Sequence, residues 1–501
     1  MQDIKLRDYQ EQAIDAVRHQ FQRGIKKVLL VAPTGAGKTV IASAMIKASQ
    51  DKSNASLFVA HRRELVKQCS QKLTDFDVNH GVLMATVSPN NFATVQVASL
   101  QTYTARKDNE HFWKPNAKII FLDEAHRSAS KTFQDLLLEY PDAYVIGLTA
   151  TPCRADGKGL GNYYDALVNC GTISELTEQG YLTPAKILAP SMPDLKGLKL
   201  QAGDYEKRGL NNRMNQPKLV GDLVSHWLEH GEGRPTVVFA SSIAHSKYIS
   251  SIFNDNGIPS GHIDGEMDEV KRVEVLRQLH EGEIKVLSNC MVLTEGWDEP
   301  KVSCVVIARP TKSYGMYLQM VGRALRPYEG KTDTLIIDHS GCVYEHGFPD
   351  EAPEWKLTTS EESAIQKKEP EPIEKQPVTC SVCHTVYKPA RGFPECPSCG
   401  AIPTKAQQQV HIQQGRLIEL VKKEKITTQD KVDFYAQLLT YAKTKSYSRG
   451  WADHTYKQKF GHFPHNKQVI AKPVSDDVKK FIQHLNIKKA KSKFHKGKIY
   501  D

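Results

Sequence analysis

Residues 28–48 join a short apolar run, a glycine-containing turn and a helical pattern, and this order constrains the fold of the 501-residue chain most. A continuous apolar run that ends in a turn is typical of a strand buried in a parallel sheet. The turn reads Ala-Pro-Thr-Gly-Ala-Gly-Lys-Thr over residues 32–39. Its two glycines let successive backbone N–H groups point inward and cradle phosphate oxygens. The sequence therefore predicts an α/β domain that binds a phosphate group.

The side chains of the turn suit a nucleoside triphosphate with magnesium. Lys38 supplies a point charge for the β and γ phosphates, and Thr39 offers a hydroxyl to Mg²⁺. The helix expected at residues 40–48 turns its positive N-terminal end toward the same phosphates. The strict pattern has glycine where Ala32 stands, so a chance Lys-Thr pair in a glycine-rich turn is the alternative for the loop alone. ATP contacts are expected from Pro33, Thr34, Gly35, Ala36, Gly37, Lys38 and Thr39.

A second apolar run, at residues 118–122, ends in two carboxylates, Asp123 and Glu124, and His126 follows. Two acids directly after a buried strand are costly unless they meet a cation. We expect Asp123 to hold Mg²⁺ and Glu124 to orient and deprotonate the attacking water. His126 is placed to relay the state of the γ-phosphate to a facing domain. The alternative is a solvated strand end, and Thr149-Ala150-Thr151-Pro152 after a third apolar run disfavours it.

These segments and several others, over residues 6–326, occur in the same order as the motifs of a known protein family. The chain resembles a superfamily 2 helicase of the DEAH type. The sequences and spacing of its motifs most resemble those of RadD-like bacterial repair helicases and phage-encoded DEAH helicases. The resemblance implies an ATP hydrolase that acts as a DNA helicase or translocase. It also implies two tandem RecA-like, doubly wound parallel-sheet domains that clasp one ATP between them.

The resemblance assigns roles residue by residue. Arg7 and Gln10 match the motif that reads adenine, and Thr149 and Thr151 match the motif that couples the two domains. It implies that Gly296 and Asp298 approach the nucleotide. Contacts with the nucleic-acid backbone are implied for His61, Arg62, Ser99, Thr102, Ser241 and Thr294.

The segment from Gln319 to Arg326 completes the implied catalytic set with Gln319, Arg323 and Arg326. The two arginines are three residues apart, so we expect them on one face of a helix. An arginine that reaches across the cleft neutralises charge on the γ-phosphate during transfer. A solvated basic helix face is the alternative for this segment taken alone.

Residues 235–338 repeat the alternation of strands and helices without a second phosphate loop. Strands are expected at residues 236–240, 260–264, 285–288, 302–308 and 334–338, and helices at residues 243–254 and 269–280. This alternation predicts a second doubly wound parallel sheet. We divide the chain into an ATP-binding domain (1–190), an arginine-bearing domain (191–345), a flexible linker (346–378), a cysteine module (379–402) and a basic C-terminal region (403–501).

The cysteine module contains two CxxC pairs, formed by Cys380, Cys383, Cys396 and Cys399. Two such pairs give a closed tetrahedral site with four sulfur ligands, so we expect one structural zinc. Two disulfides are the alternative, which a reducing cytosol disfavours. His384 could replace one cysteine ligand.

The net charge of +10 is unevenly distributed. Residues 405–501 hold 21 Lys and Arg against 8 Asp and Glu, a net charge of +13, so residues 1–404 carry −3. A basic region attached to a motor suggests a grip on nucleic acid, and a solubilising surface is the alternative. We expect helices at residues 407–425 and 430–444 and a disordered Lys-rich end. Trp451, Tyr456 and Phe460 could stack on bases, but helical spacing favours a small core.

Neither a signal peptide nor an apolar run long enough for a membrane span is evident, so we expect a cytoplasmic protein of a bacterial or phage-infected cell. The expected partner is DNA, single-stranded or forked, without excluding RNA, and no membrane. A monomer is favoured, and replication or repair proteins are possible partners in DNA repair, recombination or phage replication. The alternatives are a double-strand translocase of a restriction-type system, an RNA helicase and an ATP-gated DNA-binding scaffold.

Overall fold

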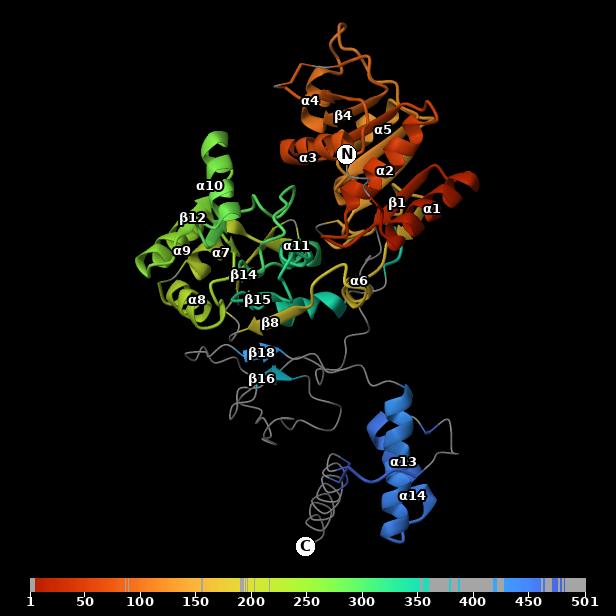
Figure 1. The fold of residues 1–501 in the computed structure, drawn as a ribbon, viewed down its shortest axis with the longest axis vertical. Helices are drawn as coiled ribbons and strands as arrows, with labels where there is room; N and C mark the ends of the chain where they lie inside the picture. The colour runs from red at the N-terminus through yellow and green to blue at the C-terminus, as the bar shows by residue number, and fades with distance from the viewer. Residues whose placement is uncertain are drawn as a thin grey trace. The chain divides into compact units, whose positions relative to one another are not determined.

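The computed structural model describes most of the chain up to residue 351 and selected segments beyond it (Figure 1). The described residues are 5–351 without 86, 89, 155, 190–192, 194, 196, 202 and 216, then 355–359, 378–379, 386–387, 418–420, 428–460, 463–464, 471–475, 478–479 and 482. Contacts divide the chain into two compact units, Met1–Val421 and Lys422–Asp501. None of the helices in the described part is both long and apolar enough to cross a membrane.

The first domain is built on a parallel sheet with the strand order β3-β4-β2-β5-β6-β1-β7. Its strands are β1 (Lys27–Val31), β2 (Ser56–Ala60), β3 (His80–Leu83), β4 (Val95–Ser99), β5 (Ile119–Asp123), β6 (Tyr144–Thr149) and β7 (Ala166–Asn169). The central strands are buried almost throughout because helices cover the sheet, as their continuous apolar runs predict. Its helices are α1 (Asp8–Gln22), α2 (Lys38–Gln50), α3 (Arg63–Asp75), α4 (Leu100–Arg106), η1 (Ala125–Arg127), α5 (Lys131–Leu138) and α6 (Ile173–Glu178).

The second domain repeats this architecture, and its parallel strands follow the order β12-β13-β11-β14-β15-β8. They are β8 (Ala185–Ala189), β11 (Thr236–Ala240), β12 (Ser260–Ile263), β13 (Val286–Asn289), β14 (Cys304–Ala308) and β15 (Thr334–Asp338). Its helices are α7 (Lys207–Met214), α8 (Pro217–His230), α9 (Ile243–Asp255), α10 (Glu269–Glu281), α11 (Tyr314–Val321), α12 (Cys342–His346) and η2 (Pro349–Glu351). A small hairpin, β9 (Leu200–Gln201) and β10 (Asp204–Tyr205), precedes α7. Two parallel-sheet α/β domains are thus confirmed.

Two predicted boundaries differ from the structure. β8 pairs with β15, so the second sheet already begins at Ala185, before the predicted boundary at residue 190. Residues 355–359 lie in the predicted linker, yet they pack on the first domain, where Gly161 N–H donates to Thr358 O at 2.7 Å. Trp355 and Leu357 give this segment apolar anchors, which the polar composition of the surrounding residues obscured.

Strands β16 (Val378–Thr379), β17 (Val386–Tyr387) and β18 (Ile418–Leu420) extend the second sheet beyond β8. β18 pairs antiparallel with β8, so the helix predicted over residues 407–425 is wrong at residues 418–420. Pairing with the edge of β8 provides backbone hydrogen bonds that outweigh a weak local helical preference. The rest of that predicted helix lies outside the described residues.

The second unit contains α13 (Thr428–Thr444) and α14 (Arg449–Phe460), which pack together. α13 confirms the helix predicted over residues 430–444. Their contact buries Tyr435, Leu438 and Tyr456, and the rings of Tyr456 and Phe460 lie 4.6 Å apart. The core interpretation of these aromatic residues is therefore correct.

Candidate active site between the two sheets

The phosphate loop lies between β1 and α2, as the sequence predicts. Gly35 and Gly37 have φ angles of 93° and 80°, which side-chain-bearing residues rarely adopt. The N–H of Ala32 donates to Thr149 O at 2.9 Å and ties the loop to β6. Nζ of Lys38 lies 3.4 Å from Ala32 O, at the centre of the loop.

The acidic pair follows β5 and is buried. Glu124 has a left-handed backbone, with φ 51° and ψ 52°, a strained conformation for a residue with a side chain. Burial and the neighbouring charge of Glu124 raise the pKa of Asp123 to about 7. Burial would also raise the pKa of Glu124, but the nearby His126 and Lys38 outweigh it and lower that pKa. The two neighbouring carboxylates therefore have opposite pKa shifts, raised for Asp123 and lowered for Glu124.

Arg323 and Arg326 do not lie on a helix face, because α11 ends at Val321 and both follow in a turn. Arg323 donates to Trp297 O at 2.5 Å and to Thr294 O at 2.9 Å. Nη1 of Arg326 lies 3.0 Å from Oδ1 of Asp298. These contacts fix both guanidinium groups on the second domain, and the side chain of Arg326 also lies beside Gly35 of the phosphate loop.

Lys331 explains how this turn is stabilised without helical hydrogen bonds. Its ammonium group donates to Ala324 O at 2.5 Å and to Arg326 O at 2.7 Å, and to Val302 O at 2.7 Å. Carbonyl groups that leave a helix need such partners. Lys331 therefore stabilises the arginine-bearing turn through its backbone carbonyl groups.

The two domains meet closely at the phosphate loop. A Cβ added to Gly322 would lie 2.3 Å from Cβ of Thr34, and one added to Gly315 would lie 2.8 Å from Oγ1 of Thr151. Gly35 in turn lies against the side chain of Arg326. Gln319 is buried in α11 between these two glycines. The structure therefore shows a closed cleft in which groups from both domains surround one site.

The site has an excess of buried positive charge. Burial lowers the pKa of Lys38 and of Arg326, and it lowers that of Arg323 to about 10, with a further contribution from Arg326. Among the described residues, none provides a hydrogen-bond partner for Thr34 Oγ1 or Arg323 Nε. Unpaired buried polar atoms are costly, so this arrangement fits an anionic ligand with many oxygen atoms.

An aromatic platform lies beside the loop at the N-terminus of α1. The guanidinium of Arg7 lies 5.0 Å from the ring centre of Tyr181, and the rings of Tyr9 and Tyr181 are also 5.0 Å apart. Gln10 Nε2 and the hydroxyl of Tyr9 both donate to Ala36 O, at 3.2 and 2.8 Å. Tyr9 and Tyr181 were not predicted from the sequence, although Tyr9 stands between the two predicted residues.

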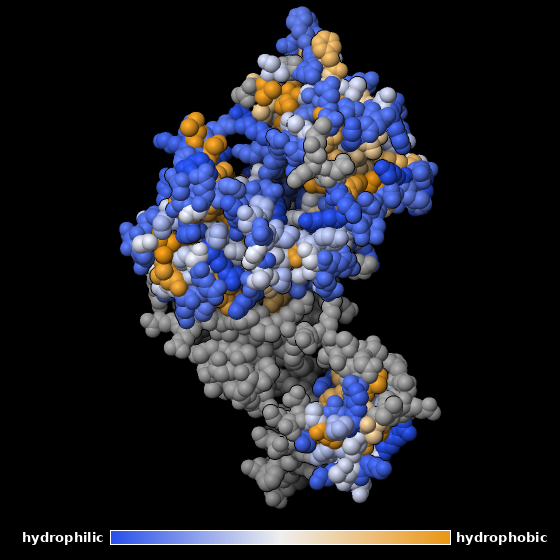
Figure 2. Space-filling view, viewed as in Figure 1, coloured by the Kyte–Doolittle hydropathy of each residue, from blue (hydrophilic) through white to orange (hydrophobic). Residues whose placement is uncertain are grey.

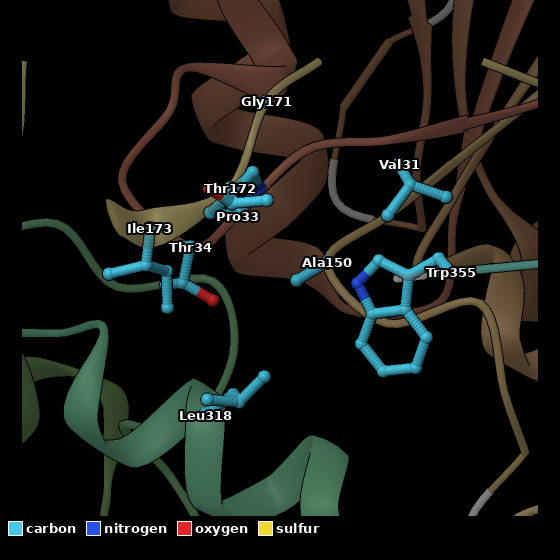
Figure 3. A pocket seen from close by; sticks show the side chains of 9 residues that line it. All are labelled: Val31, Pro33, Thr34, Ala150, Gly171, Thr172, Ile173, Leu318 and Trp355. Carbon is cyan, nitrogen blue, oxygen red and sulfur yellow. The ribbon is translucent and has the colours of Figure 1, made fainter. Parts of the chain in front are cut away.

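An apolar pocket adjoins the phosphate loop and has an empty volume of about 370 Å³, including its open mouth. Figure 3 shows its lining, which comes from the loop, the start of α6, α11 and the segment of residues 355–359. The lining residues are Val31, Pro33, Thr34, Ala150, Gly171, Thr172, Ile173, Leu318 and Trp355. Neither Lys38 nor the acidic pair lines it, so it neighbours the charged site.

The residues with predicted nucleic-acid contacts lie at or after the ends of strands β2, β4, β11 and β13, with Thr102 inside α4. Four of them are buried: Ser99, Thr102, Ser241 and Thr294. Ser241 Oγ lies 2.8 Å from Nδ1 of His245. Thr294 donates to Met291 O at 3.3 Å. Contact from such positions requires backbone groups or a different conformation, and the predicted roles stay predictions.

The coupling pair is arranged within the first domain, where Thr149 Oγ1 donates to Thr151 O at 2.8 Å. Both side chains are buried, and Thr151 lies close to Gly315 of α11. Gly296 lies against Leu65 at the start of α3, and its predicted approach to the nucleotide stays a prediction. Its φ of 72° explains the glycine.

Glu295 was not predicted, yet it has the densest set of charged partners in the described interface. His61 Nε2 and Arg62 Nε lie 2.9 and 3.1 Å from its Oε2, and Arg127 Nη2 lies 3.1 Å from its Oε1. His61 and Arg62 therefore contact the second domain here. Glu295 stands between Thr294 and Gly296, to which the family resemblance assigns roles, but its own partners are far away in the sequence.

The four cysteines of the predicted zinc module lie outside the described residues. Within the described part of the chain, no group of three or more His, Cys, Asp or Glu side chains is placed to hold a metal ion. The six cysteines of the described residues are free thiols, namely Cys69, Cys153, Cys170, Cys290, Cys304 and Cys342. Burial raises the pKa of Cys153, near the cleft, to about 12, which opposes a reactive role.

Two family models match the chain, one on each domain. Residues 3–154 match the model of the type III restriction enzyme res subunit, and residues 216–328 match the helicase conserved C-terminal domain. The matched ranges contain the phosphate loop and acidic pair in the first case and the arginine-bearing turn in the second.

Similar proteins come from phage and yeast. A 51.5 kDa protein of a Lactococcus phage is 28% identical over 79% of this chain and 83% of its own length. The putative ATP-dependent helicase IRC3 of Saccharomyces cerevisiae is 31% identical over 67% of this chain, which spans about half (52%) of that relative. The restriction-modification enzyme LlaBIII, solved bound to DNA, has a similar fold, with a TM-score of 0.52 and 19% identity over 67% of this chain and 28% of its own.

Proposed function

The chain belongs to the superfamily 2 helicases and hydrolyses ATP, and from this we propose that it is a DNA-dependent motor that unwinds or moves along DNA. One observation carries the proposal. The arginine-bearing turn of the second domain meets the phosphate loop of the first, where Gly322 leaves no room beside Thr34. Hydrolysis therefore depends on domain closure, which is the movement that such a motor uses.

We assign the chemistry of the site to residues of both domains. Lys38 neutralises the β and γ phosphates, and Glu124 orients the attacking water and takes its proton. Arg323 and Arg326 neutralise charge on the γ-phosphate as the bond to ADP breaks. Thr39 and Asp123 provide oxygen ligands that fit Mg²⁺, which supplies further charge neutralisation.

The aromatic platform is the proposed base site. The adenine ring would lie against Arg7 and Tyr181, where a flat π surface and a planar cation can both stack on it. Gln10 is held at the loop by Ala36 O and presents its amide beside the same platform. This placement supports the expected adenine-reading role of Arg7 and Gln10.

DNA is preferred over RNA because the resembling proteins include restriction enzymes, one of them solved bound to DNA. The basic excess lies in the second unit, which agrees with a grip on a polyanion. We keep the backbone contacts predicted for His61, Arg62, Ser99, Thr102, Ser241 and Thr294 as part of the proposal, together with coupling by Thr149 and Thr151.

The test compares ATP turnover with single-stranded DNA, duplex DNA, RNA and no nucleic acid, using the full chain and Glu124→Gln. We expect DNA to stimulate turnover most and Glu124→Gln to reduce it by about 10²-fold or more. Labelled forked duplexes then test unwinding. Equal turnover in all four conditions would contradict the motor, and parental turnover by Glu124→Gln would contradict the assigned base.

A second candidate is a translocase that follows duplex DNA without separating its strands. The match of residues 3–154 to a restriction-enzyme subunit favours it. Displacement of a third strand from a triplex, without unwinding of a forked duplex, would identify this activity. Stimulation by RNA alone would instead indicate an RNA helicase, and binding without turnover would indicate an ATP-gated scaffold.

We further propose one structural zinc at Cys380, Cys383, Cys396 and Cys399, since two CxxC pairs provide four thiolates. Elemental analysis is expected to find one zinc per chain, and Cys396→Ser to lower that content. A role in DNA repair, recombination or phage replication is consistent with the phage relative. Zinc-free protein that folds fully would contradict the metal site.

A further inference from the structure

Glu295 lies in the loop after β13 and enters the first domain, where it is buried among cationic side chains. Two guanidinium groups and one imidazole contact its carboxylate, from Arg62, Arg127 and His61, at 3.1, 3.1 and 2.9 Å. Nε2 of His126 lies 3.9 Å from its Oε1. One acid of the second domain thus gathers four basic residues of the first.

The same cluster reaches both functional parts of the first domain. On one side, Nδ1 of His126 lies 3.3 Å from Oε2 of Glu124, the proposed base. On the other side, His61 and Arg62 stand between β2 and α3, where a nucleic-acid contact is proposed. Arg62 also donates to Val292 O at 3.2 Å. Through Glu295, the side chains of His126, His61 and Arg62 therefore connect Glu124 in the hydrolytic site with the start of α3.

We propose that Glu295 is a positioning residue that couples nucleic-acid binding at the start of α3 to the orientation of His126 and Glu124. The proposal rests on the proposed DNA-dependent motor and deepens it, because it identifies a contact through which DNA would accelerate hydrolysis. Glu295 touches no reacting atom, so it acts through its partners.

The electrostatics of the cluster favour a two-state element. A buried carboxylate is strongly disfavoured when it loses its partners, so Glu295 either stays with all of them or leaves for solvent when the domains part. Burial would raise its pKa, but the hydrogen bond from His61 and the charges of Arg127 and Arg62 hold that pKa well below its usual range. Closure therefore fixes His126 and α3 together.

Other ion pairs between the two domains provide a matched control. Lys67 on α3 lies 2.6 Å from Glu269 on α10, and both side chains are exposed. This pair crosses the same interface from the same helix but does not reach His126 or Glu124. Like Glu295→Gln, Glu269→Gln removes one interdomain carboxylate. It leaves the contacts of Glu295 with His126, His61 and Arg62 in place.

The experiment measures ATP turnover of the full chain with saturating single-stranded DNA and without DNA, and compares the ratio of the two rates. We expect Glu295→Gln to lower this ratio at least tenfold and Glu269→Gln to change it less than twofold. An ion pair that only stabilises the interface would lower both rates together and leave the ratio unchanged. A parental ratio in Glu295→Gln, with parental thermal stability, overturns the proposal.

Arg127→Gln is the second variant, in case Glu295→Gln does not fold. The Arg127 side chain is 43% exposed, and its loss leaves Glu295 with His61 and Arg62. We expect its ratio to fall between those of the parent and Glu295→Gln, and a parental ratio counts against the proposal. A parent that DNA does not stimulate overturns the proposed function and this coupling together, whereas a stimulated parent with equally stimulated variants overturns the coupling alone.

Discussion

Gly322 of the second domain lies close to Thr34 of the phosphate loop. Its backbone is right-handed, with φ −62° and ψ −13°, so alanine would cause no backbone strain there. The added Cβ would nevertheless lie 2.3 Å from Cβ of Thr34 in the closed cleft. We expect Gly322→Ala to lower ATP turnover about tenfold or more, since overpacking costs ~1–3 kcal/mol. Steady-state kinetics and thermal unfolding check this.

Gly221 provides the control for this substitution. It lies within α8, and a Cβ added there would meet no atom within 4 Å. Alanine at this position should leave turnover unchanged and raise the free energy of unfolding by ~1 kcal/mol, because alanine favours helices. If both variants turned over ATP at the parental rate, the closed cleft would not be the reactive state.

Two buried histidines in the second domain predict a loss of stability in mild acid. Burial lowers the pKa of His245 to about 4, and burial with the neighbouring His226 lowers that of His339 to about 3. Below pH ~6.5 the unfolded chain binds protons that the folded chain does not, so stability falls as the pH falls toward 4. His245 alone contributes on the order of 3 kcal/mol to this loss.

Chemical denaturation at pH 7.5 and pH 5 measures the effect. We expect the parent to lose stability between these values and His245→Asn to lose less, because one titrating group is absent. The quantity compared is the change in the free energy of unfolding between pH 7.5 and pH 5. A substitution that lowers stability equally at both pH values therefore leaves this quantity unchanged. A variant with the parental pH dependence would show that His245 is protonated in the folded domain.

Single residues differ in how far the sequence predicts them. Lys38 and Asp123 follow from local patterns, because a loop and a strand end create their environments. The environment of Glu295 is formed by His61, Arg62 and Arg127, which lie some 170 to 230 residues away. No local sequence pattern predicts these contacts. Tyr181 joins Arg7 for the same reason.

Helices and strands are likewise predicted well where local sequence determines them and poorly where distant partners do. Strands such as β11 and β15 have the predicted bounds because their apolar runs fit a buried parallel sheet. The arginine-bearing turn was predicted as a helix, since its composition is helical and the partners that end it are distant. Lys331 satisfies the carbonyls that a helix would have paired.

The segment of residues 355–359 is the element that ties the second domain back to the first. Trp355 lines the pocket with Val31 and Ala150, and its ring lies 6.0 Å from that of Tyr314 on α11. A Cβ added to Gly159 would lie 2.2 Å from Thr358 O, so this glycine permits the contact. The segment therefore contacts both domains where the cleft closes.

We expect Trp355→Ala to favour the open cleft. Loss of the ring removes apolar contact with both domains, which should lower the free energy of unfolding by ~1–3 kcal/mol and raise the KM for ATP. Thermal unfolding and ATP kinetics measure these effects. The exposed neighbour Lys356 is the control, and Lys356→Ala should match the parent. An unchanged KM for Trp355→Ala would limit the segment to a stabilising role.

At the scale of the whole molecule, charge and architecture are divided between the two units. Residues 422–501 carry 19 Lys and Arg against 7 Asp and Glu, and they have their own aromatic core. Figure 2 shows hydrophilic residues over most of the visible face of the described parts. Tyr447 remains 45% exposed beside the exposed Lys443 and Lys445, so this unit offers both stacking and ionic contacts.

Removal of residues 422–501 tests whether this unit grips DNA. The sheet domains form a separate compact unit, so we expect the truncated chain to retain ATP hydrolysis without DNA. Its dissociation constant for single-stranded DNA should rise. The slope of the logarithm of the association constant against log salt should become less negative by about 0.7 for each lost phosphate contact. Equilibrium titrations at several salt concentrations measure both. Lys443→Gln with Lys445→Gln should reproduce part of the loss, whereas an unchanged slope after truncation would make this unit a solubilising surface.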